Sequence, residues 1–168
     1  ASEVLDRGLA TESERDESVW IDETAIVHED ATLRPPVVVG PDCEIGPGAV
    51  IGPHSALGRN VTVGANATVE NTVLDADTRV EAGSTLIDAV TGQHVSLGPN
   101  TVVSGGPADV RVGNEVFEDE ELGAVIADRV RVEGGVGFTP GALVGPNARI
   151  DTGVTVDGQV RENAEVRR

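Results

Sequence analysis

The stretch PVVVGPDCEIGPGAVIGPHSALG, residues 36–58, decides the fold of this chain. Within it an aliphatic residue returns at every sixth position, at Val39, Ile45, Ile51 and Leu57, and glycine follows each one directly. The residue two positions earlier is small or apolar, so both side chains of a hexad point to the same side of a short strand. Glycine, proline, asparagine and aspartate occupy the positions between, where tight corners need them. Each hexad therefore predicts one short strand and one corner.

The six-residue period continues far beyond this stretch. A first run of inward aliphatics consists of Ile21, Val27, Leu33, Val39, Ile45, Ile51, Leu57, Val63 and Val69. A second run consists of Ile126, Val132, Phe138, Val144, Ile150 and Val156. Between the runs the register slips but continues through Leu74, Val80, Leu86, Thr91, Leu97 and Val103. Since three hexads make one triangular coil, the pattern predicts an all-β, parallel β-helix solenoid of about seven coils.

The composition agrees with a narrow core. The chain has two Phe, one Trp, no Tyr and no Met, but 21 Gly and 9 Pro. The single cysteine, Cys43, excludes an internal disulfide and fits a reducing, cytoplasmic location. It occupies a small inward position, so we expect a buried packing thiol. No apolar run approaches the ~20 residues that a membrane span needs.

The charge excludes two classes of partner. The formal net charge is −17, all 12 basic residues are arginines, and no lysine occurs. Nucleic acids and anionic membranes both need a basic footprint, which this chain lacks. Acid spread along a chain without lysine is typical of halophilic proteins, in which salt screens the repulsion. The alternative is an acidic mesophilic protein from a GC-rich genome.

The sequence divides into three kinds of segment. Residues 1–18 are polar and acidic and predict a linker or short helix, whereas residues 19–168 carry the β-helix. Residues 104–121, SGGPADVRVGNEVFEDEE, interrupt the hexads with two β-like stretches around a Gly-Asn pair. This insertion loop predicts a hairpin that leaves one corner of the solenoid. Insertions in solenoids often mark the binding side.

Residues 18 apart lie above one another on the same face of a triangular solenoid. Trp20, Val38 and Ala56 form an apolar column by this rule, and Trp20 is the only tryptophan. Exposed apolar stripes usually mark interfaces, so we expect this column to contact a neighbouring subunit or an adjoining domain. The alternative is a set of scattered surface aliphatics without a partner.

Arg131 and Arg149 stack by the same rule in the second run. Two arginines one coil apart can hold a phosphate by charge-assisted hydrogen bonds, so they are candidate cofactor-binding residues. The alternative is that each pairs with a neighbouring carboxylate.

Three segments carry a resemblance to a known family: residues 36–58, DAVTGQHVSLGPNT at 88–101, and LGAVIADRVRVEGGVGFTPGALVGPNARI at 122–150. They resemble the left-handed β-helix acyltransferases, and more closely the C-terminal domain of archaeal sugar-1-phosphate nucleotidylyltransferases. These enzymes are similar to the bacterial bifunctional UDP-N-acetylglucosamine pyrophosphorylase/glucosamine-1-phosphate acetyltransferase. The resemblance implies a left-handed solenoid, a homotrimer and acetyl-CoA between adjacent solenoids. It also implies an upstream, Mg²⁺-dependent nucleotidylyltransferase domain, to which residues 1–18 would be the linker.

The resemblance fails at the acetyl-transfer residues. The bacterial relatives use a histidine as general base, and an arginine, a lysine and a tyrosine that hold the sugar phosphate. The matching positions here are Gly52 for the arginine, Glu70 for the lysine, Ala82 for the histidine and Thr85 for the tyrosine. Alanine cannot accept a proton, and glutamate reverses the charge offered to a phosphate. We therefore do not expect acetyl transfer by the bacterial arrangement.

The three histidines offer only a rearranged site. His54 and His94 fall at corners and are candidate catalytic bases, together with the loop 104–121. The alternative is that both are solvated corner residues. His28, His54 and His94 are separated by 26 and 40 residues, which are not multiples of 18, so they are not expected to stack or to bind zinc.

The leading interpretation is the solenoid domain of a sugar-1-phosphate nucleotidylyltransferase that serves trimer assembly, with a degenerate acetyltransferase site. One alternative is an active acyl-CoA-dependent sugar acetyltransferase with a rearranged site. Another is a purely structural or binding solenoid.

Removing salt is expected to destabilise the fold, because carboxylates in a chain of net charge −17 repel one another when ions do not screen them. The melting temperature should therefore rise from low to molar KCl. Circular dichroism melts across a KCl series at constant pH measure this. A melting temperature that does not move would contradict the halophilic interpretation.

Overall fold

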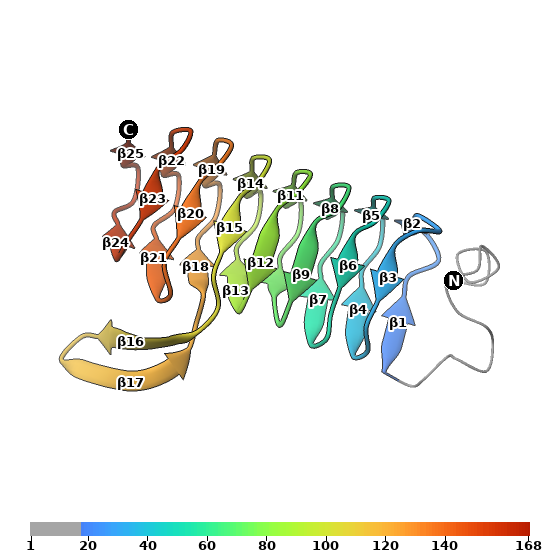
Figure 1. Cartoon of the computed structure of the whole chain (residues 1–168), viewed down its shortest axis with the longest axis horizontal. Helices are drawn as coiled ribbons and strands as arrows, with labels where there is room; N and C mark the ends of the chain where they lie inside the picture. The colour runs from blue at the N-terminus through green and yellow to red at the C-terminus, as the bar shows by residue number, and fades with distance from the viewer. Residues whose placement is uncertain (1–17) are drawn as a thin grey trace.

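The structure, a computed structural model, describes residues 18–168. The expected linker over residues 1–18 lies outside the described part except for Ser18. The described chain winds into a left-handed parallel β-helix, an all-β prism with three faces. Its coils follow one another along the long axis of Figure 1. Nowhere in residues 18–168 is there a helix long and apolar enough to span a bilayer.

Each face of the prism is one parallel sheet. Face A consists of β1 (Val19–Ile21), β4 (Val37–Val39), β7 (Ser55–Leu57), β10 (Val73–Leu74), β13 (Ala89–Thr91), β18 (Ala124–Ile126), β21 (Ala142–Val144) and β24 (Gln159–Val160). Face B consists of β2 (Ile26–Val27), β5 (Glu44–Ile45), β8 (Thr62–Val63), β11 (Arg79–Val80), β14 (Ser96–Leu97), β19 (Arg131–Val132), β22 (Arg149–Ile150) and β25 (Glu165–Val166). Face C consists of β3 (Thr32–Leu33), β6 (Val50–Ile51), β9 (Thr68–Glu70), β12 (Thr85–Ile87), β15 (Val102–Val103), β20 (Gly137–Phe138) and β23 (Thr155–Val156).

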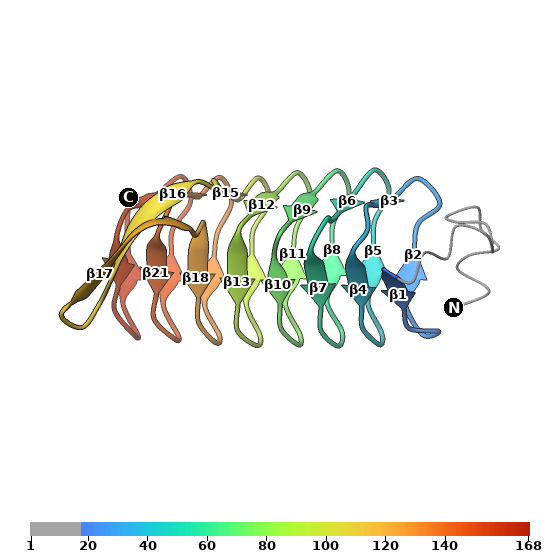
Figure 2. The ribbon, with the colours of Figure 1, turned by 90° about the horizontal axis from the view of Figure 1, so that it is seen from below.

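The insertion forms the predicted hairpin. Strands β16 (Pro107–Val112) and β17 (Glu115–Glu121) pair antiparallel, with Gly113 and Asn114 between them. Figures 1 and 2 both show this hairpin leaving the prism after β15 and running toward its C-terminal end before the chain returns at β18.

The expectation of seven coils was one too few. Faces A and B each hold eight strands, so the solenoid makes about eight turns. The last turn was missed because the inward Val160 comes only four positions after the inward Val156. The six-residue period stops there, although β24 and β25 pair with the preceding coil in register.

All irregularity of the solenoid lies on one edge. Steps from a face A strand to the next face B strand, and from face B to face C, are six residues throughout. The CA edge, where the chain passes from face C to face A, takes steps of five residues at Val69–Leu74 and Leu86–Thr91. It also carries the hairpin and the four-residue step near the C-terminus. These shortened corners explain the register slip between the two hexad runs.

The core is one side chain wide. Nearly all aliphatics of the two runs are 8% exposed or less, and Phe138 is the largest fully buried side chain. In the middle coils hydroxyl residues replace alanine at the small inward position, and each hydroxyl finds a backbone carbonyl. Thr72 Oγ1 donates to Glu70 O at 2.8 Å, and Thr101 Oγ1 donates to Gly98 O at 2.7 Å. These buried polar groups are thus satisfied without widening the core.

Shortening a core side chain should leave a cavity that the narrow prism cannot close. Leu97 is 0% exposed, so Leu97→Ala is expected to lower the free energy of unfolding by about 2–5 kcal/mol. The control Ile26→Ala, at a side chain 52% exposed, should change it by less than about 0.5 kcal/mol. Urea unfolding followed by circular dichroism measures both. Equal losses for the two variants would be inconsistent with this core.

Candidate functional site

Face A presents an apolar column along almost the whole prism. The outward residues, in register from coil to coil, are Trp20, Val38, Ala56, Val73, Val90, Val125, Leu143 and Gln159. The predicted stacking of Trp20, Val38 and Ala56 is confirmed, and Trp20, Val38 and Val73 are 53%, 45% and 47% exposed. That this column is an interface stays a prediction.

Face C is also free of charge in its outward column. Its members are Thr32, Val50, Thr68, Thr85, Val102, Gly137 and Thr155. The outward columns of faces A and C are therefore both uncharged in a chain whose net charge is −17, whereas the CA edge between them carries Glu70 and Asp88.

Face B carries the charges. Its outward column is Ile26, Glu44, Thr62, Arg79, Ser96, Arg131, Arg149 and Glu165. Arg131 and Arg149 lie directly opposite each other on β19 and β22, as their spacing predicts. Whether they bind a cofactor stays a prediction at this point.

The three histidines lie on three different edges of the prism, each of which is named by the two faces that it joins. His28 follows β2 on the BC edge, His54 precedes β7 on the CA edge, and His94 precedes β14 on the AB edge. His54 and His94 both have a left-handed backbone, with φ of 56°, and both side chains are exposed. They occupy corners, as predicted, but the structure does not bring them together.

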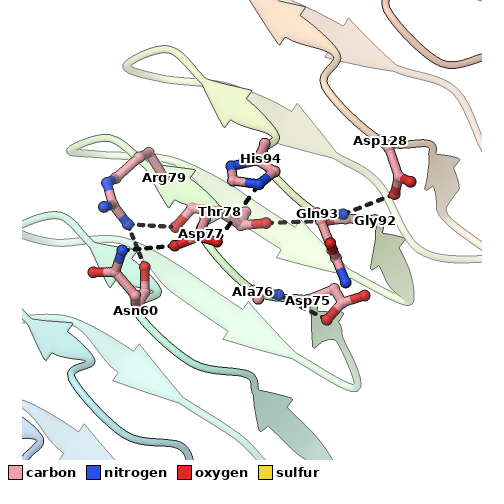
Figure 3. A network of polar contacts seen from close by, with 10 residues as sticks. All are labelled: Asn60, Asp75, Ala76, Asp77, Thr78, Arg79, Gly92, Gln93, His94 and Asp128. Atoms are coloured by element: carbon pink, nitrogen blue, oxygen red, sulfur yellow. Dashed lines mark hydrogen bonds and ion pairs between the residues drawn. The ribbon is translucent and has the colours of Figure 1, made fainter.

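His94 belongs to a ladder of corner residues on the AB edge, shown in Figure 3. Asn60, Asp77 and His94 occupy the same corner position in successive coils, each with φ between 55° and 61°. Asn60 Nδ2 donates to Asp77 Oδ1 at 2.7 Å, and His94 Nε2 lies 3.6 Å from Asp77 Oδ2. Arg79 donates to the backbone carbonyl of Asn60, which fixes its guanidinium on that side.

This ladder sets the ionisation of Asp77. The hydrogen bond from Asn60 lowers the pKa of Asp77 most, desolvation opposes it, and the nearby His94, Arg59 and Arg79 each lower the pKa by a smaller amount. Asp77 is therefore an ionised partner for His94 and orients one face of its ring. The arrangement resembles a histidine held by a carboxylate, but among residues 18–168 no hydrogen bond joins His94 to a hydroxyl or a thiol.

A surface hollow of about 460 Å³ adjoins His94 on face B. It is lined by His94, Ser96, Arg129, Val130 and Arg131. The structure thus brings a predicted catalytic candidate, His94, next to a predicted cofactor-binding candidate, Arg131. We call this set, with Arg149 in the next coil, the basic hollow.

The sequence left open that each of the two stacked arginines pairs with a neighbouring carboxylate, and no such pair is present among residues 18–168. Within residues 18–168 the guanidinium groups of Arg131 and Arg149 form neither an ion pair nor a hydrogen bond. Arg129 is part of the hollow but was missed, because sequence spacing cannot relate it to His94 across the hairpin. Its Nε donates to Asn147 Oδ1 at 2.8 Å in the next coil.

A second hollow lies on the same face nearer the N-terminal end. It is lined by Ile26, His28, Glu29 and Glu44 among others. Its two carboxylates make it unsuited to an anion. Within residues 18–168 no group of three or more His, Cys, Asp or Glu side chains is placed to hold a metal ion.

The positions that match the bacterial acetyl-transfer residues lie around face C. Gly52 and Glu70 stand at its CA edge, Ala82 at its BC edge, and Thr85 in its outward column. Gly52 has φ of 99°, and a Cβ there would lie 2.0 Å from the carbonyl oxygen of Arg34. The corner itself therefore excludes an arginine at this place, beyond the change of residue.

Cys43 is the buried packing thiol expected from its position. It is 0% exposed, and its Sγ lies 2.9 Å from the carbonyl oxygen of Gly58, to which it donates. Burial raises the pKa of the Cys43 thiol, so it remains protonated and unreactive at neutral pH.

Two families of known proteins match the chain. The family described as the GMPPB C-terminal domain matches residues 41–137. The bacterial transferase hexapeptide (six repeats) matches residues 18–53. A curated relative, the bifunctional protein GlmU of Methanococcus maripaludis, is 27% identical over 103 residues, which are 58% of this chain and 25% of that protein. The matched part thus spans a quarter of the length of the relative.

The chain is also similar to solved structures. The acetyltransferase domain of PglB from Neisseria gonorrhoeae in complex with acetyl coenzyme A is 19% identical, with a TM-score of 0.50, over 84% of this chain and 53% of that one. A hexapeptide transferase family protein from Anaplasma phagocytophilum is 21% identical, with a TM-score of 0.47, over 84% of this chain and 74% of that one.

Removing the amide of Asn60 should raise the pKa of Asp77 toward its ordinary value, because that hydrogen bond is the largest cause of the lowering. Asn60→Gly suits the test, since φ is 55° there, and Asn66→Gly on the BC edge (φ 57°) is the matched control. Carboxyl ¹³C NMR titration of Asp77 measures both. An unchanged titration in Asn60→Gly would contradict the ladder.

The sign for stability follows from the direction of this shift. A pKa that is lower in the folded state means that ionised Asp77 stabilises the fold above about pH 4, and that this contribution is lost as the pH falls through the lowered pKa. The acid-side loss should therefore be smaller in Asn60→Gly than in Asn66→Gly.

Proposed function

Because the chain belongs to the GMPPB C-terminal domain family of hexapeptide-repeat proteins, we propose that it is the solenoid domain of a sugar-1-phosphate nucleotidylyltransferase and assembles that enzyme into a homotrimer. Nucleotidyl transfer, with Mg²⁺, would belong to a separate N-terminal domain, as the resemblance to bifunctional enzymes implies. The relative named GlmU supports this proposal through a quarter of its length. The observation that carries the proposal is the apolar column of face A.

The length of this exposed apolar column favours a partner that covers it. It runs through seven successive strands from Trp20 to Leu143, about 30 Å at a strand spacing of about 4.8 Å. Surface aliphatics scattered singly are ordinary, but a contiguous stripe of this length is typical of an interface.

Charge decides which surfaces two copies can bring together. Each copy carries a net charge of −17, so contact through charged surfaces is opposed by repulsion. The outward columns of faces A and C contain no charged residue, and the one charged residue of their described strands is Glu70, at the CA end of β9. Packing face A of one copy on face C of the next is a heterologous contact, and repetition of such a contact about an axis closes a ring. The family resemblance sets the number of copies at three.

The acetyltransferase site of the bacterial relatives is degenerate in this proposal. Gly52 leaves no room for an arginine, Glu70 would repel a sugar phosphate, and Ala82 cannot act as a base. Thr85 has no phenol to replace the tyrosine.

An acyl-CoA-dependent transferase with a rearranged site is the second candidate. One observation favours it: the exposed His54 lies on the CA edge, the same edge from which the hairpin β16–β17 projects. The PglB domain with a similar fold was solved with acetyl coenzyme A. A solenoid with a purely structural or binding role is the third candidate.

A charge placed in the face A column should break the assembly. At high KCl the wild-type chain is expected to have the mass of a trimer by size-exclusion chromatography with light scattering, and Val38→Glu or Trp20→Glu that of a monomer. Ile26→Glu is the matched control, because Ile26 is an equally exposed aliphatic on face B (52% against 45% for Val38). It should remain trimeric. A wild-type monomer, or an unchanged mass in both face A variants, would rule out the proposed assembly.

Calorimetric titration of acetyl-CoA into the same samples separates the candidates. A trimer that does not bind acetyl-CoA supports the scaffold, whereas a trimer that binds it, and loses binding in His54→Ala, supports the rearranged transferase.

A further inference from the structure

We propose that the basic hollow on face B is a binding site for a small molecule that carries a phosphate or diphosphate group. The site consists of His94, Ser96, Arg129 and Arg131, with Arg149 in the next coil. It does not rest on the assembly proposed above, because it lies on the face that the assembly leaves free.

The concentration of cations here is unusual for this chain. The protein has 12 arginines against 29 acidic residues, yet three of those arginines and a histidine lie within three successive coils. The chain does not place cations so densely on the outward columns of faces A and C. The basic hollow therefore gathers three arginines and a histidine in a chain whose net charge is −17.

Neither of the two stacked arginines is bonded to a carboxylate within residues 18–168, although Glu165 lies opposite Arg149. Arg131 and Arg149 are directly opposite on neighbouring strands, about 4.8 Å apart, a placement in which like charges are destabilising. Neither guanidinium forms an ion pair or a hydrogen bond among residues 18–168. An anion between them would convert this repulsion into two charge-assisted contacts.

Three carboxylates of the neighbouring coils already have partners. Asp128 Oδ1 accepts from the backbone N–H of Gln93 at 2.9 Å, and Asp77 accepts from Asn60. Glu165, opposite Arg149 in the last coil, pairs with Arg167 at 2.9 Å. These bonds occupy carboxylate oxygens, so the guanidinium donors of Arg131 and Arg149 stay available to an anion.

The donors suit a phosphoryl group. Arginine presents a planar fork of N–H donors that matches two phosphate oxygens, and Arg129 is held in place through its Nε by Asn147. Ser96, in the same coil as His94 and directly opposite Arg131 in the face B column, adds a hydroxyl. The volume of about 460 Å³ is of the size of small-molecule sites, about 300–1,000 Å³.

Inorganic pyrophosphate and ADP are suitable probes, titrated at constant KCl in a buffer free of phosphate and sulfate. Isothermal calorimetry, with ³¹P NMR line broadening as a second readout, should show saturable binding with one site per chain. Tighter binding of ADP than of pyrophosphate would support a nucleotide as the natural source of the phosphate. Equal affinity would support a free phosphate or diphosphate.

Loss of an arginine from the hollow should weaken binding specifically. Arg131→Gln is expected to raise the dissociation constant for pyrophosphate about tenfold or more, since charge-assisted hydrogen bonds are lost. The matched control is Arg111→Gln, an exposed arginine on the hairpin strand β16, which should stay within about twofold of wild type. Melting curves should show that pyrophosphate stabilises wild type and Arg111→Gln but not Arg131→Gln.

Three results would overturn the proposal. They are no saturable binding of either probe, equal weakening in Arg131→Gln and Arg111→Gln, or unchanged binding in Arg131→Gln. A change of oligomeric mass in Arg131→Gln, without pyrophosphate binding in wild type, would also overturn it. That result would point instead to the acidic strand β17 of another copy as the occupant of the hollow.

Discussion

The structure depends on the hydrogen-bond ladder that ties each coil to the next. Its strands are only two or three residues long in the prism, yet their backbone N–H groups donate to carbonyls one coil away, as in Ile26 N to Cys43 O at 2.8 Å and Thr32 N to Ala49 O at 2.8 Å. Because the ladder is parallel, it holds residues of successive coils in register on every face. A core one side chain wide and faces made of columns both follow from this register.

The columns are what allow so thin a protein to have distinct surfaces. Each outward residue lies between the outward residues of the coils before and after it. A few substitutions in one column can therefore change the polarity of a whole face. The outward column of face A is apolar, that of face C is uncharged, and that of face B holds the arginines. The AB edge adds polar ladders such as Asn60–Asp77–His94, in which left-handed corners aim short side chains at one another. Function in this fold is therefore a matter of columns and edges rather than of one deep cleft.

The same register explains how much the sequence could predict. Where coils are 18 residues long, spacing alone placed Val38 over Trp20 and Arg149 over Arg131, and both pairs lie in register. Where CA corners shorten to five residues, that rule no longer held, so the continuation of the apolar column through Val73 and Val90 was not expected. The basic hollow could not be predicted from the sequence. Gln93 and Asp128 are bonded neighbours 35 residues apart in sequence, because the hairpin intervenes, and no periodic rule relates His94 to Arg129.

Every change in coil length falls on the CA edge, so only the AB and BC edges keep a constant spacing. The AB and BC steps are six residues throughout, so the side chains along them keep their register and can form ladders. The CA edge tolerates steps of four and five residues and an entire hairpin, since the ladder closes again at β18 without loss of register. Geometry that a ligand needs is thus best kept on the regular edges and face B, where Arg131 and His94 lie. Segments that contact a partner of variable shape are best placed at the CA edge, between the two uncharged outward columns.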